Sequence, residues 1–217
     1  MPKPYSLILF DLDGTLIDSR KDIVDSANRM LKAMSLPQKT EKEIAAFVGH
    51  GLGNLLIDCI GHENKDRADE ALKFFKKDYE EHMLDETKLF PGVEHVLNNL
   101  ENAQNIVKVV VTNKPLYYSE KILKSFEIFS KFDLVLGGDM DFPRKPEPDC
   151  VYYLLKEFKV KKENAIIIGD SLVDVRTGKN AGIQTCAMTY GFGSLASLEQ
   201  EQPDYLLDSF SELLKII

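Results

Sequence analysis

The sequence predicts an α/β protein with a doubly wound parallel sheet and a helical domain inserted after the first strand. From residue 88 onward, short β-rich runs alternate with segments of helical spacing, which is the pattern of a parallel sheet covered by helices. Residues from about 17 to 86 contain no convincing strand, and their apolar residues recur at helical intervals. We therefore expect an α/β core of residues 1–16 and 87–217 and an inserted helical domain of residues 17–86.

Short runs rich in apolar residues are the candidate strands of the core. One run, at 6–10, precedes the insertion, and the others lie at 106–112, 132–136, 165–169, 184–188 and 205–207. Between them, helical spacing occurs at 116–126, 148–158 and 173–181. Gly182 suits the end of the last helix, because glycine readily takes the left-handed conformation that often follows a helix.

Two long helices and two shorter ones are expected in the insertion. The long helices are predicted by apolar residues that recur every three or four positions, namely Ile23, Ala27, Met30, Leu31 and Met34, and then Ala68, Ala71, Leu72, Phe75, Tyr79 and Met83. The shorter helices are expected at 40–48 and 52–60, separated by the glycine-rich segment 49–53. Residues 89–92 would then bring the chain back to the core.

The composition is that of a globular protein that can bury its own core, with 217 residues of which 44% are hydrophobic. Cys59, Cys150 and Cys186 form no CxxC pair, so we expect buried, free thiols. The longest apolar run, 150–155, is far shorter than a bilayer span, and the first ten residues lack the apolar stretch of a signal peptide. The net charge of −8 disfavours nucleic-acid binding. We expect a cytoplasmic protein that binds neither membranes nor nucleic acid.

The strongest local signal is Asp11-Leu12-Asp13-Gly14-Thr15, directly after the first candidate strand. Side chains two residues apart in an extended backbone share a side, so Asp11 and Asp13 can project into one site. In isolation, such residues more often form a turn or cap a helix. Three further polar clusters favour a site here, because ligands in open α/β sheets bind at the carboxyl ends of strands.

These three clusters are Thr112-Asn113-Lys114, Arg144-Lys145-Pro146-Glu147-Pro148-Asp149 and Gly169-Asp170-Ser171-Leu172-Val173-Asp174. In the first, a threonine hydroxyl and backbone amides at a strand-to-helix turn can cradle a phosphate, although Thr and Asn also serve there as caps. In the second, prolines would present Lys145 rigidly, and a solvated loop is the alternative. In the third, Asp170 and Asp174 offer the oxygen ligands that magnesium prefers.

The succession DLDGT, TN, KPEPD and GDSLVD resembles the four motifs of the haloacid dehalogenase superfamily of aspartate-nucleophile phosphotransferases. The resemblance covers nearly the whole chain, and four motifs in this order at these spacings are highly specific. Dehalogenases of the superfamily lack the second Asp of the first motif, so Asp13 favours phosphoryl chemistry. The helical insertion resembles the C1-type cap of this family, which closes over the site and selects the leaving group.

The resemblance implies a magnesium-dependent phosphatase that works through an aspartyl-phosphate intermediate. Asp11 would be the nucleophile, and Asp13 would act first as the general acid and then as the general base. Thr112 and the backbone amide of Asn113 would bind phosphate oxygens. Lys145 would neutralise both the phosphate and Asp11.

The implied magnesium ligands are the carboxylates of Asp11 and Asp170 and the backbone carbonyl of Asp13, with Asp174 bound directly or through water. With a phosphate dianion present and Asp13 protonated, the acidic groups carry about −5, whereas magnesium and Lys145 supply about +3. The metal is then the largest compensating charge, so we expect little activity without it. In the cap, the place of His50 in a glycine-rich loop indicates a substrate contact, with a solvated turn as the alternative.

Within the superfamily the chain is most similar to phosphoglycolate phosphatases, by its length, its glycine-containing cap loop and Thr189-Tyr190-Gly191-Phe192-Gly193 after the fourth motif. Pyrophosphatases and sugar-phosphate phosphatases or phosphomutases share the same motifs and cap type, and they stay open as alternatives. A phospho-acceptor signalling module is a more distant alternative, since such modules place the accepting Asp after a later strand. The expected partner is a small phosphorylated metabolite, and the expected assembly is a monomer or homodimer.

Overall fold

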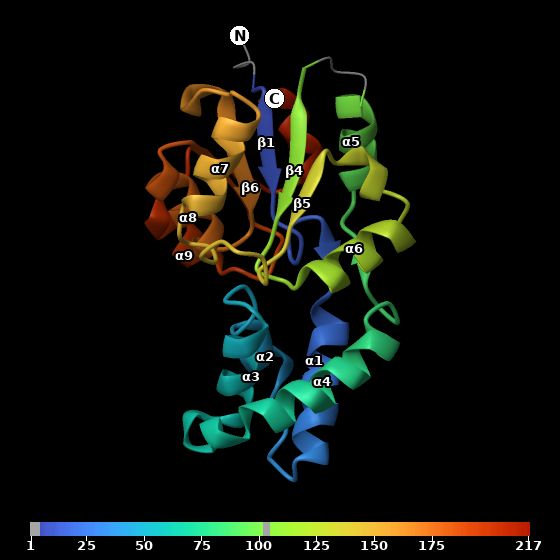
Figure 1. The fold of residues 1–217 in the computed structure, drawn as a ribbon. Helices are drawn as coiled ribbons and strands as arrows, with labels where there is room; N and C mark the ends of the chain where they lie inside the picture. The colour runs from blue at the N-terminus through green and yellow to red at the C-terminus, as the bar shows by residue number, and fades with distance from the viewer. Residues whose placement is uncertain (1–4, 102–104) are drawn as a thin grey trace.

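A six-stranded sheet with the order β5-β4-β1-β6-β7-β8 forms the centre of the computed structural model, which describes residues 5–101 and 105–217 (Figure 1). Every pairing within this sheet is parallel. The first four residues of the predicted core lie outside the described residues. From β1 the chain continues to β4 and β5 on one side and to β6, β7 and β8 on the other, so the strand order reverses at β1. Ligands in such sheets bind at this switch point.

The strands of this sheet agree with the predicted runs. They are β1 (Leu7–Phe10), β4 (Val107–Val111), β5 (Leu134–Leu136), β6 (Ala165–Gly169), β7 (Gln184–Met188) and β8 (Tyr205–Leu207). The flanking helices are α5 (Val93–Glu101), α6 (Leu116–Ser125), α7 (Asp149–Glu157), α8 (Leu172–Ala181) and α9 (Leu195–Glu201), with the short 3₁₀ helices η2 (Phe129–Lys131), η3 (Lys162–Asn164) and η4 (Phe210–Lys215). The predicted doubly wound α/β fold is therefore confirmed.

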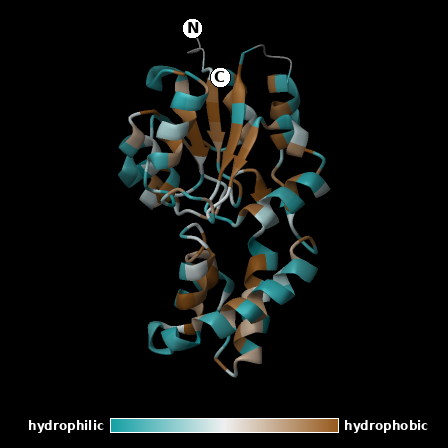
Figure 2. Ribbon diagram, viewed as in Figure 1, coloured by the Kyte–Doolittle hydropathy of each residue, from teal (hydrophilic) through white to brown (hydrophobic). Residues whose placement is uncertain are grey.

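Strand β1 shows why the core sequence contains continuous apolar runs rather than an alternating pattern. Leu7 and Leu9 pack into one hydrophobic cluster, which includes residues of α7, whereas Ile8 and Phe10 belong to a second cluster with α5 and α6. Both faces of the strand are thus buried, as expected for a parallel sheet covered on both sides. Figure 1 shows α5 and α6 on one side of the sheet and α7, α8 and α9 on the other, and Figure 2 shows the apolar strands between them.

The residues between β1 and β4 include a group of helices that lies beyond the carboxyl ends of the sheet strands (Figure 1). It consists of α1 (Arg20–Ala33), α2 (Glu41–Ala45), α3 (Leu52–Ile60), the 3₁₀ helix η1 (His62–Arg67) and α4 (Ala68–His82). Helix α1 packs against α4, and α3 also contacts α4. The apolar stripe predicted for the first long helix is buried, including Met30 on α1. That of the second is buried at most positions, including Phe75 on α4, whereas Ala68 and Leu72 are partly buried.

Two details of the insertion differ from the sequence expectation. The region predicted to lack strands begins with the two-residue strand β2 (Ile17–Asp18), which pairs antiparallel with β3 (Lys88–Leu89). The ribbon holds the two connections between the helical group and the sheet side by side. The helix expected at 40–48 ends at Ala45, because the next residues form a tight turn into Gly49, whose φ of 103° is left-handed.

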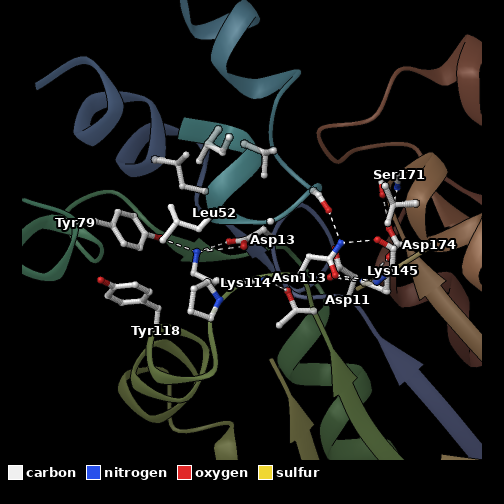
Figure 3. A pocket seen from close by; sticks show the side chains of 18 of the residues that line it. Asp11, Asp13, Leu52, Tyr79, Asn113, Lys114, Tyr118, Lys145, Ser171 and Asp174 are labelled. Carbon is white, nitrogen blue, oxygen red and sulfur yellow. Dashed lines mark hydrogen bonds and ion pairs between the residues drawn. The ribbon is translucent and has the colours of Figure 1, made fainter. Parts of the chain in front are cut away.

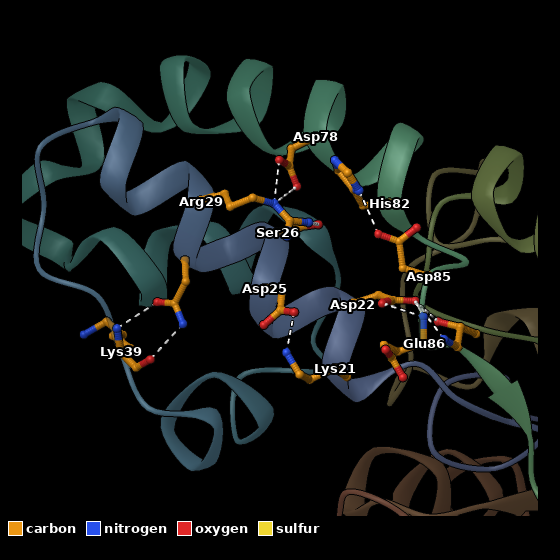
Figure 4. Close-up of polar contacts among 12 residues, drawn as sticks. Lys21, Asp22, Asp25, Ser26, Arg29, Lys39, Asp78, His82, Asp85 and Glu86 are labelled. Atoms are coloured by element: carbon orange, nitrogen blue, oxygen red, sulfur yellow. Dashed lines mark hydrogen bonds and ion pairs between the residues drawn. The ribbon is translucent and has the colours of Figure 1, made fainter.

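Asp22 fixes the start of α1 against the chain segment that returns from α4 (Figure 4). Its buried carboxylate accepts hydrogen bonds from the backbone amides of Glu86, at 3.0 Å, and Thr87, at 2.8 Å. The Thr87 hydroxyl donates a third bond, at 2.7 Å. These donors satisfy the buried carboxylate, and the hydrogen bonds hold the start of α1 against the segment that follows α4.

The three cysteines are buried and free, as predicted. No helix in the described parts of the chain is long and apolar enough to cross a membrane. The glycine expected to end α8, Gly182, has a left-handed backbone with φ of 74° and ψ of 33°.

Candidate active site

The four polar clusters identified in the sequence meet at the carboxyl ends of β1, β4 and β6, beneath the helical insertion. Asp11 and Asp13 follow β1, Thr112 and its neighbours follow β4, and Asp170 follows β6. Lys145 comes from the loop between β5 and α7. A cavity between this edge of the sheet and the insertion is lined by residues of all four clusters (Figure 3).

Lys145 joins two acidic residues that are far apart in the sequence. Its Nζ lies 2.8 Å from Asp11 Oδ1 and 2.6 Å from Asp174 Oδ1, and all three side chains are almost completely buried. Asp174 is held from its other oxygen by Ser171, whose hydroxyl donates at 2.6 Å and whose backbone amide donates at 3.2 Å. This capping box at the start of α8 aims the remaining Asp174 oxygen at the cavity.

Asp170 is fixed by donors on both of its oxygens. Thr15 Oγ1 donates to Oδ1 at 3.1 Å, and the backbone amide of Phe192 donates to Oδ2 at 2.6 Å. Gly14 makes room for this carboxylate: it has a φ of 86°, and a Cβ atom there would lie 2.3 Å from Asp170 Oδ2. The glycine of the first motif is therefore needed both for its backbone conformation and for the close approach of Asp170.

Asp11, Asp170 and Asp174 form a group whose carboxylate oxygens lie within 4.8 Å of one another, and all three residues are buried. Three converging carboxylates are too close to share a dry site without positive charge, and oxygen-only ligands suit a hard divalent cation. The side chain of Asp13 is not part of this group. A divalent metal fits the residues present.

The protonation of these acids reflects their burial. Burial raises the pKa of Asp170 to about 8, and the carboxylates of Asp11 and Asp174 act in the same direction. Burial also raises the pKa of Asp11 to about 7, against the opposing effect of Lys145. For Lys145 itself, burial lowers the pKa, but Asp11 and Asp174 outweigh it and leave the pKa above its usual value. A bound cation would favour the ionised form of the acids.

Thr112 and Asn113 both line the cavity, and their side chains are buried. The side chain of Asn113 is fully engaged: its Oδ1 accepts from the Lys145 backbone amide at 3.0 Å, and its Nδ2 donates to the carbonyls of Lys145, at 2.9 Å, and Gly49, at 2.7 Å. Asn113 thus positions the Lys145 backbone and joins the sheet edge to the loop after α2.

Asp13 lies on the opposite side of the cavity from Asp174, in a separate group of contacts (Figure 3). Its carboxylate accepts from Lys114 Nζ at 2.9 Å and from the hydroxyl of Ser19. Lys114 Nζ also donates to the hydroxyl of Tyr79, on α4, at 2.7 Å. The predicted pair Asp11 and Asp13 therefore faces one cavity but contacts two different lysines.

His50 is exposed, and it lines a wider pocket that also includes Asp11, Asp13 and Asp170, rather than the smaller cavity beside Lys114. Its backbone carbonyl accepts a hydrogen bond from Asn54 Nδ2 at 3.0 Å. Its glycine neighbours, Gly49 and Gly51, do line the smaller cavity.

For three residues that lie in the site, the sequence predicts no functional role: Lys114, Tyr79 and Ser171. Lys114 belongs to the cluster Thr112-Asn113-Lys114, so its place next to Thr112 and Asn113 was the available signal. Ser171 precedes Asp174 by three residues, the spacing of a capping box. Tyr79 is part of an apolar helical stripe, and only the fold shows that its hydroxyl reaches the site.

The chain is similar to known proteins over most of its length. The model of the family described as haloacid dehalogenase-like hydrolase matches residues 8–188. A protein named phosphoglycolate phosphatase from Mannheimia succiniciproducens is 32% identical, with 100% of both chains covered. Another protein of that name, from Aquifex aeolicus, is 34% identical and covers 97% of this chain and 96% of its own.

Solved structures of similar proteins agree with this family match. A crystal structure of a predicted phosphoglycolate phosphatase from Haemophilus somnus 129PT superposes with a TM-score of 0.92 at 32% identity, covering 98% of each chain. A haloacid dehalogenase-like family hydrolase from Streptococcus pneumoniae superposes with a TM-score of 0.87 at 30% identity, again covering 98% of each chain. Together with the family match over most of the sequence, these similarities show that the chain belongs to the haloacid dehalogenase-like hydrolases.

Proposed function

We propose that this hydrolase is a magnesium-dependent phosphatase that cleaves 2-phosphoglycolate, or a closely related small phosphomonoester, through an aspartyl-phosphate intermediate. The observation that carries the proposal is the convergence of three buried carboxylates with Lys145 at the carboxyl end of β1. Phosphoryl transfer depends mainly on positioning and on charge compensation, and this arrangement supplies both.

Asp11 is the proposed nucleophile. It directly follows the central strand, and its backbone amide donates to the Ile168 carbonyl at 2.8 Å, which holds it at the sheet edge. Its Oδ1 is bound by Lys145, so the other oxygen is the one left to attack phosphorus. The P–O bond to Asp11 forms as the bond to the leaving alcohol breaks, and water then cleaves the acyl phosphate.

Asp13 is the proposed general acid and base. It stands two residues from Asp11 and lines the same cavity, so it can reach the oxygen that leaves on the opposite side of phosphorus. It would give its proton to the leaving alkoxide and later accept one from the attacking water. Ser19 and Lys114 hold its carboxylate in place for these steps.

Thr112, the Asn113 amide and Lys145 are the proposed phosphate-binding groups. All three residues are buried at the cavity, so their contacts with phosphate oxygens would be screened little by solvent. Asp11, Asp170 and Asp174, with the Asp13 backbone carbonyl, would hold magnesium. When bound, the metal supplies positive charge next to the phosphoryl oxygens.

Residues 17–86 are the proposed cap domain, on a core of 1–16 and 87–217. The insertion covers the carboxyl ends of the strands and contributes apolar residues of α1, α3 and α4 to the cavity. Such a cover excludes water from the acyl phosphate and limits the leaving group. We assign His50, which lines the same wide pocket as Asp11 and Asp13, a role in contacting substrate.

The relatives named phosphoglycolate phosphatase support this substrate, since the similarity extends over essentially the whole of each chain. The main alternative is a pyrophosphatase or a sugar-phosphate phosphatase of the same family, because the catalytic motifs are shared.

A panel of phosphoesters tests the proposal. Phosphate release is measured for 2-phosphoglycolate, sugar phosphates, nucleotides and pyrophosphate, with magnesium and with a chelator. The highest kcat/KM is expected for 2-phosphoglycolate, with loss of activity in the chelator. A clear preference for pyrophosphate or a sugar phosphate would reject this substrate while keeping the reaction class. Phosphate release that persists in the chelator would reject the metal dependence.

A further inference from the structure

The segment 190–193, which follows β7 and reads Tyr-Gly-Phe-Gly, lies against the carboxylate of Asp170. The backbone amides of Phe192 and Gly193 donate to Asp170 Oδ2, at 2.6 Å and 3.3 Å. A Cβ atom on Gly191 would lie 2.3 Å from the Asp170 Cβ, and one on Gly193 would lie 2.1 Å from the Asp170 carbonyl oxygen. The two glycines therefore let the backbone come close enough for these amides to reach the carboxylate.

Two contacts attach the segment 190–193 to residues that follow β1. At its start, the Tyr190 hydroxyl donates to the Thr15 carbonyl at 2.8 Å. At its centre, Arg20 Nη2 donates to the Gly191 carbonyl at 2.9 Å. The guanidinium carbon of Arg20 also lies 4.7 Å from the centroid of the Phe192 ring, a distance at which the cation is attracted to the ring face.

The hydrogen bond from Arg20 acts on the same peptide group that binds Asp170. The Gly191 carbonyl and the Phe192 amide belong to one planar, trans peptide group, so the C=O and the N–H point in opposite directions. When Arg20 binds the carbonyl on one side, the N–H is directed to the other side, where Asp170 Oδ2 accepts it. The bond to the carbonyl also polarises the group and strengthens the N–H as a donor.

Arg20 has no acidic partner that would account for its position. Among the described residues, it forms no ion pair with a carboxylate, and its Nε is buried without a hydrogen-bond partner. Arg29, Arg67 and Arg176, by contrast, each pair with an acid. The side chain of Arg20 is therefore held by its contacts with the segment 190–193.

Resting on the proposed function, in which Asp170 holds magnesium, we propose that Arg20 is a positioning residue of the metal site. It fixes the peptide group between Gly191 and Phe192, and this group fixes the carboxylate of Asp170. Arg20 is not itself a metal ligand and takes no part in the chemical step. Since it is the first residue of α1, its contact with Gly191 also links the metal site to the helical insertion.

The direction of the change in magnesium affinity separates positioning from a simple charge effect. If Arg20 acted only through its charge, its removal would tighten magnesium binding, because a positive charge repels the cation. Loss of a group that orients a metal ligand weakens binding instead. A direct contact with substrate is the other alternative, because Arg20 lines the wide pocket that includes Asp11, Asp13 and Asp170.

Magnesium titration by calorimetry tests the assignment. In Arg20→Gln, the dissociation constant of magnesium should rise at least about tenfold. Arg20→Lys, which can still donate to the Gly191 carbonyl, should stay within about threefold of wild type. Arg29→Gln is the control, because it removes the same charge about 14 Å further along α1, where screening leaves little effect on the site, and should leave the constant unchanged.

Two further readouts distinguish positioning from general damage. At saturating magnesium, the kcat of Arg20→Gln should return to within about threefold of wild type, because Asp11, Asp13 and Lys145 are unchanged. In the metal-free protein, the Phe192 amide should exchange with solvent severalfold faster, because its peptide group has lost an anchor. If circular dichroism shows that Arg20→Gln does not fold, Phe192→Leu takes its place. That variant keeps the backbone amide, loses the ring beside the guanidinium and should also weaken magnesium binding.

An unchanged or lowered magnesium dissociation constant in a folded Arg20→Gln protein would overturn the assignment. A raised KM for 2-phosphoglycolate with an unchanged magnesium constant would do so as well, and would assign Arg20 to the substrate. Failure of the proposed function gives a different result. A wild-type protein that binds no magnesium would reject the proposed metal site and the role of Arg20 with it, whereas identical magnesium binding in wild type and Arg20→Gln rejects only the role of Arg20.

Discussion

Lys145 lies between Asp11 and Asp174, with its Nζ 2.8 Å from one carboxylate and 2.6 Å from the other. The same two acids belong to the candidate metal site. One lysine therefore touches the proposed nucleophile and a proposed metal ligand at once, so its removal should affect catalysis and metal binding in opposite directions.

Lys145→Met should lower kcat/KM for phosphate release by about 10³-fold or more, since a phosphate-neutralising group is lost at the reacting centre. It should also tighten magnesium binding severalfold, because a positive charge leaves the neighbourhood of the acids. Kinetics and magnesium titration by calorimetry measure the two effects. Weaker magnesium binding in a folded Lys145→Met protein would contradict this electrostatic account.

Asp22→Ala should reduce the free energy of unfolding by roughly 2–4 kcal/mol, because one donor of Glu86 and two buried donors of Thr87 lose their acceptor. Urea denaturation measures the change. Asp25→Ala is the matched control on the same helix. Among the described residues, Asp25 forms an ion pair with the exposed Lys21, and losing this pair should lower the free energy of unfolding by less than about 1 kcal/mol. Similar values for both variants would show that the Asp22 contacts do not stabilise the junction.

Gly14→Ala should disturb the metal site as well as the backbone. The new Cβ would lie 2.3 Å from Asp170 Oδ2 at a φ of 86°, so Asp170 must move. We expect magnesium affinity to fall about tenfold or more. Gly53→Ala is the control, because this helical position has open space around the added atom and should gain about 0.5–1 kcal/mol of stability. Unchanged magnesium affinity in Gly14→Ala would place the metal away from Asp170.

Asp170 should make the stability of the metal-free protein depend on pH. Its pKa is raised to about 8, from about 3.9 in an unfolded chain, so its contribution to stability is present at low pH and lost as the pH rises through 8. Asp170→Asn lacks this titration. Between pH 5 and pH 9, the stability of the variant relative to wild type should therefore rise by roughly 4 kcal/mol.

Chemical denaturation at the two pH values, in the presence of a chelator, measures that difference. Magnesium should restore wild-type stability at pH 9 and should do less for Asp170→Asn, which has lost one carboxylate oxygen of the site. A stability difference that is the same at both pH values would show that Asp170 titrates normally.

The sheet could be predicted from sequence because each of its strands is a compact apolar run. A parallel strand covered on both faces, such as β1, has no alternation to recognise, but its burial makes the run itself distinctive. The ends were less accurate: the third predicted strand began at Phe132, which is extended in the structure, but pairing with β4 and therefore β5 begin only at Leu134. The β2–β3 ribbon was missed since two-residue strands carry no periodic signal.

The site was predictable to the extent that it consists of strand-end residues. Asp11, Thr112 and Asp170 follow apolar runs, so the sheet topology alone brings them together. The contact of Lys114 with Tyr79 could not be found in this way, because it depends on how α4 of the insertion sits over the sheet. Tyr79 also occupies a position of the apolar stripe of its helix. The spacing of that stripe predicts burial, and it does not reveal that the hydroxyl reaches the site.

The most direct test of the account is to identify the phosphorylated residue. Wild-type protein is mixed with 2-phosphoglycolate and magnesium, quenched in acid and digested, and the peptides are weighed by mass spectrometry. The account predicts one added phosphoryl group on the peptide that contains Asp11, and neither adduct nor phosphate release in a folded Asp11→Asn protein. Turnover at the wild-type rate in Asp11→Asn, or a phosphoryl group on a different residue, would contradict it.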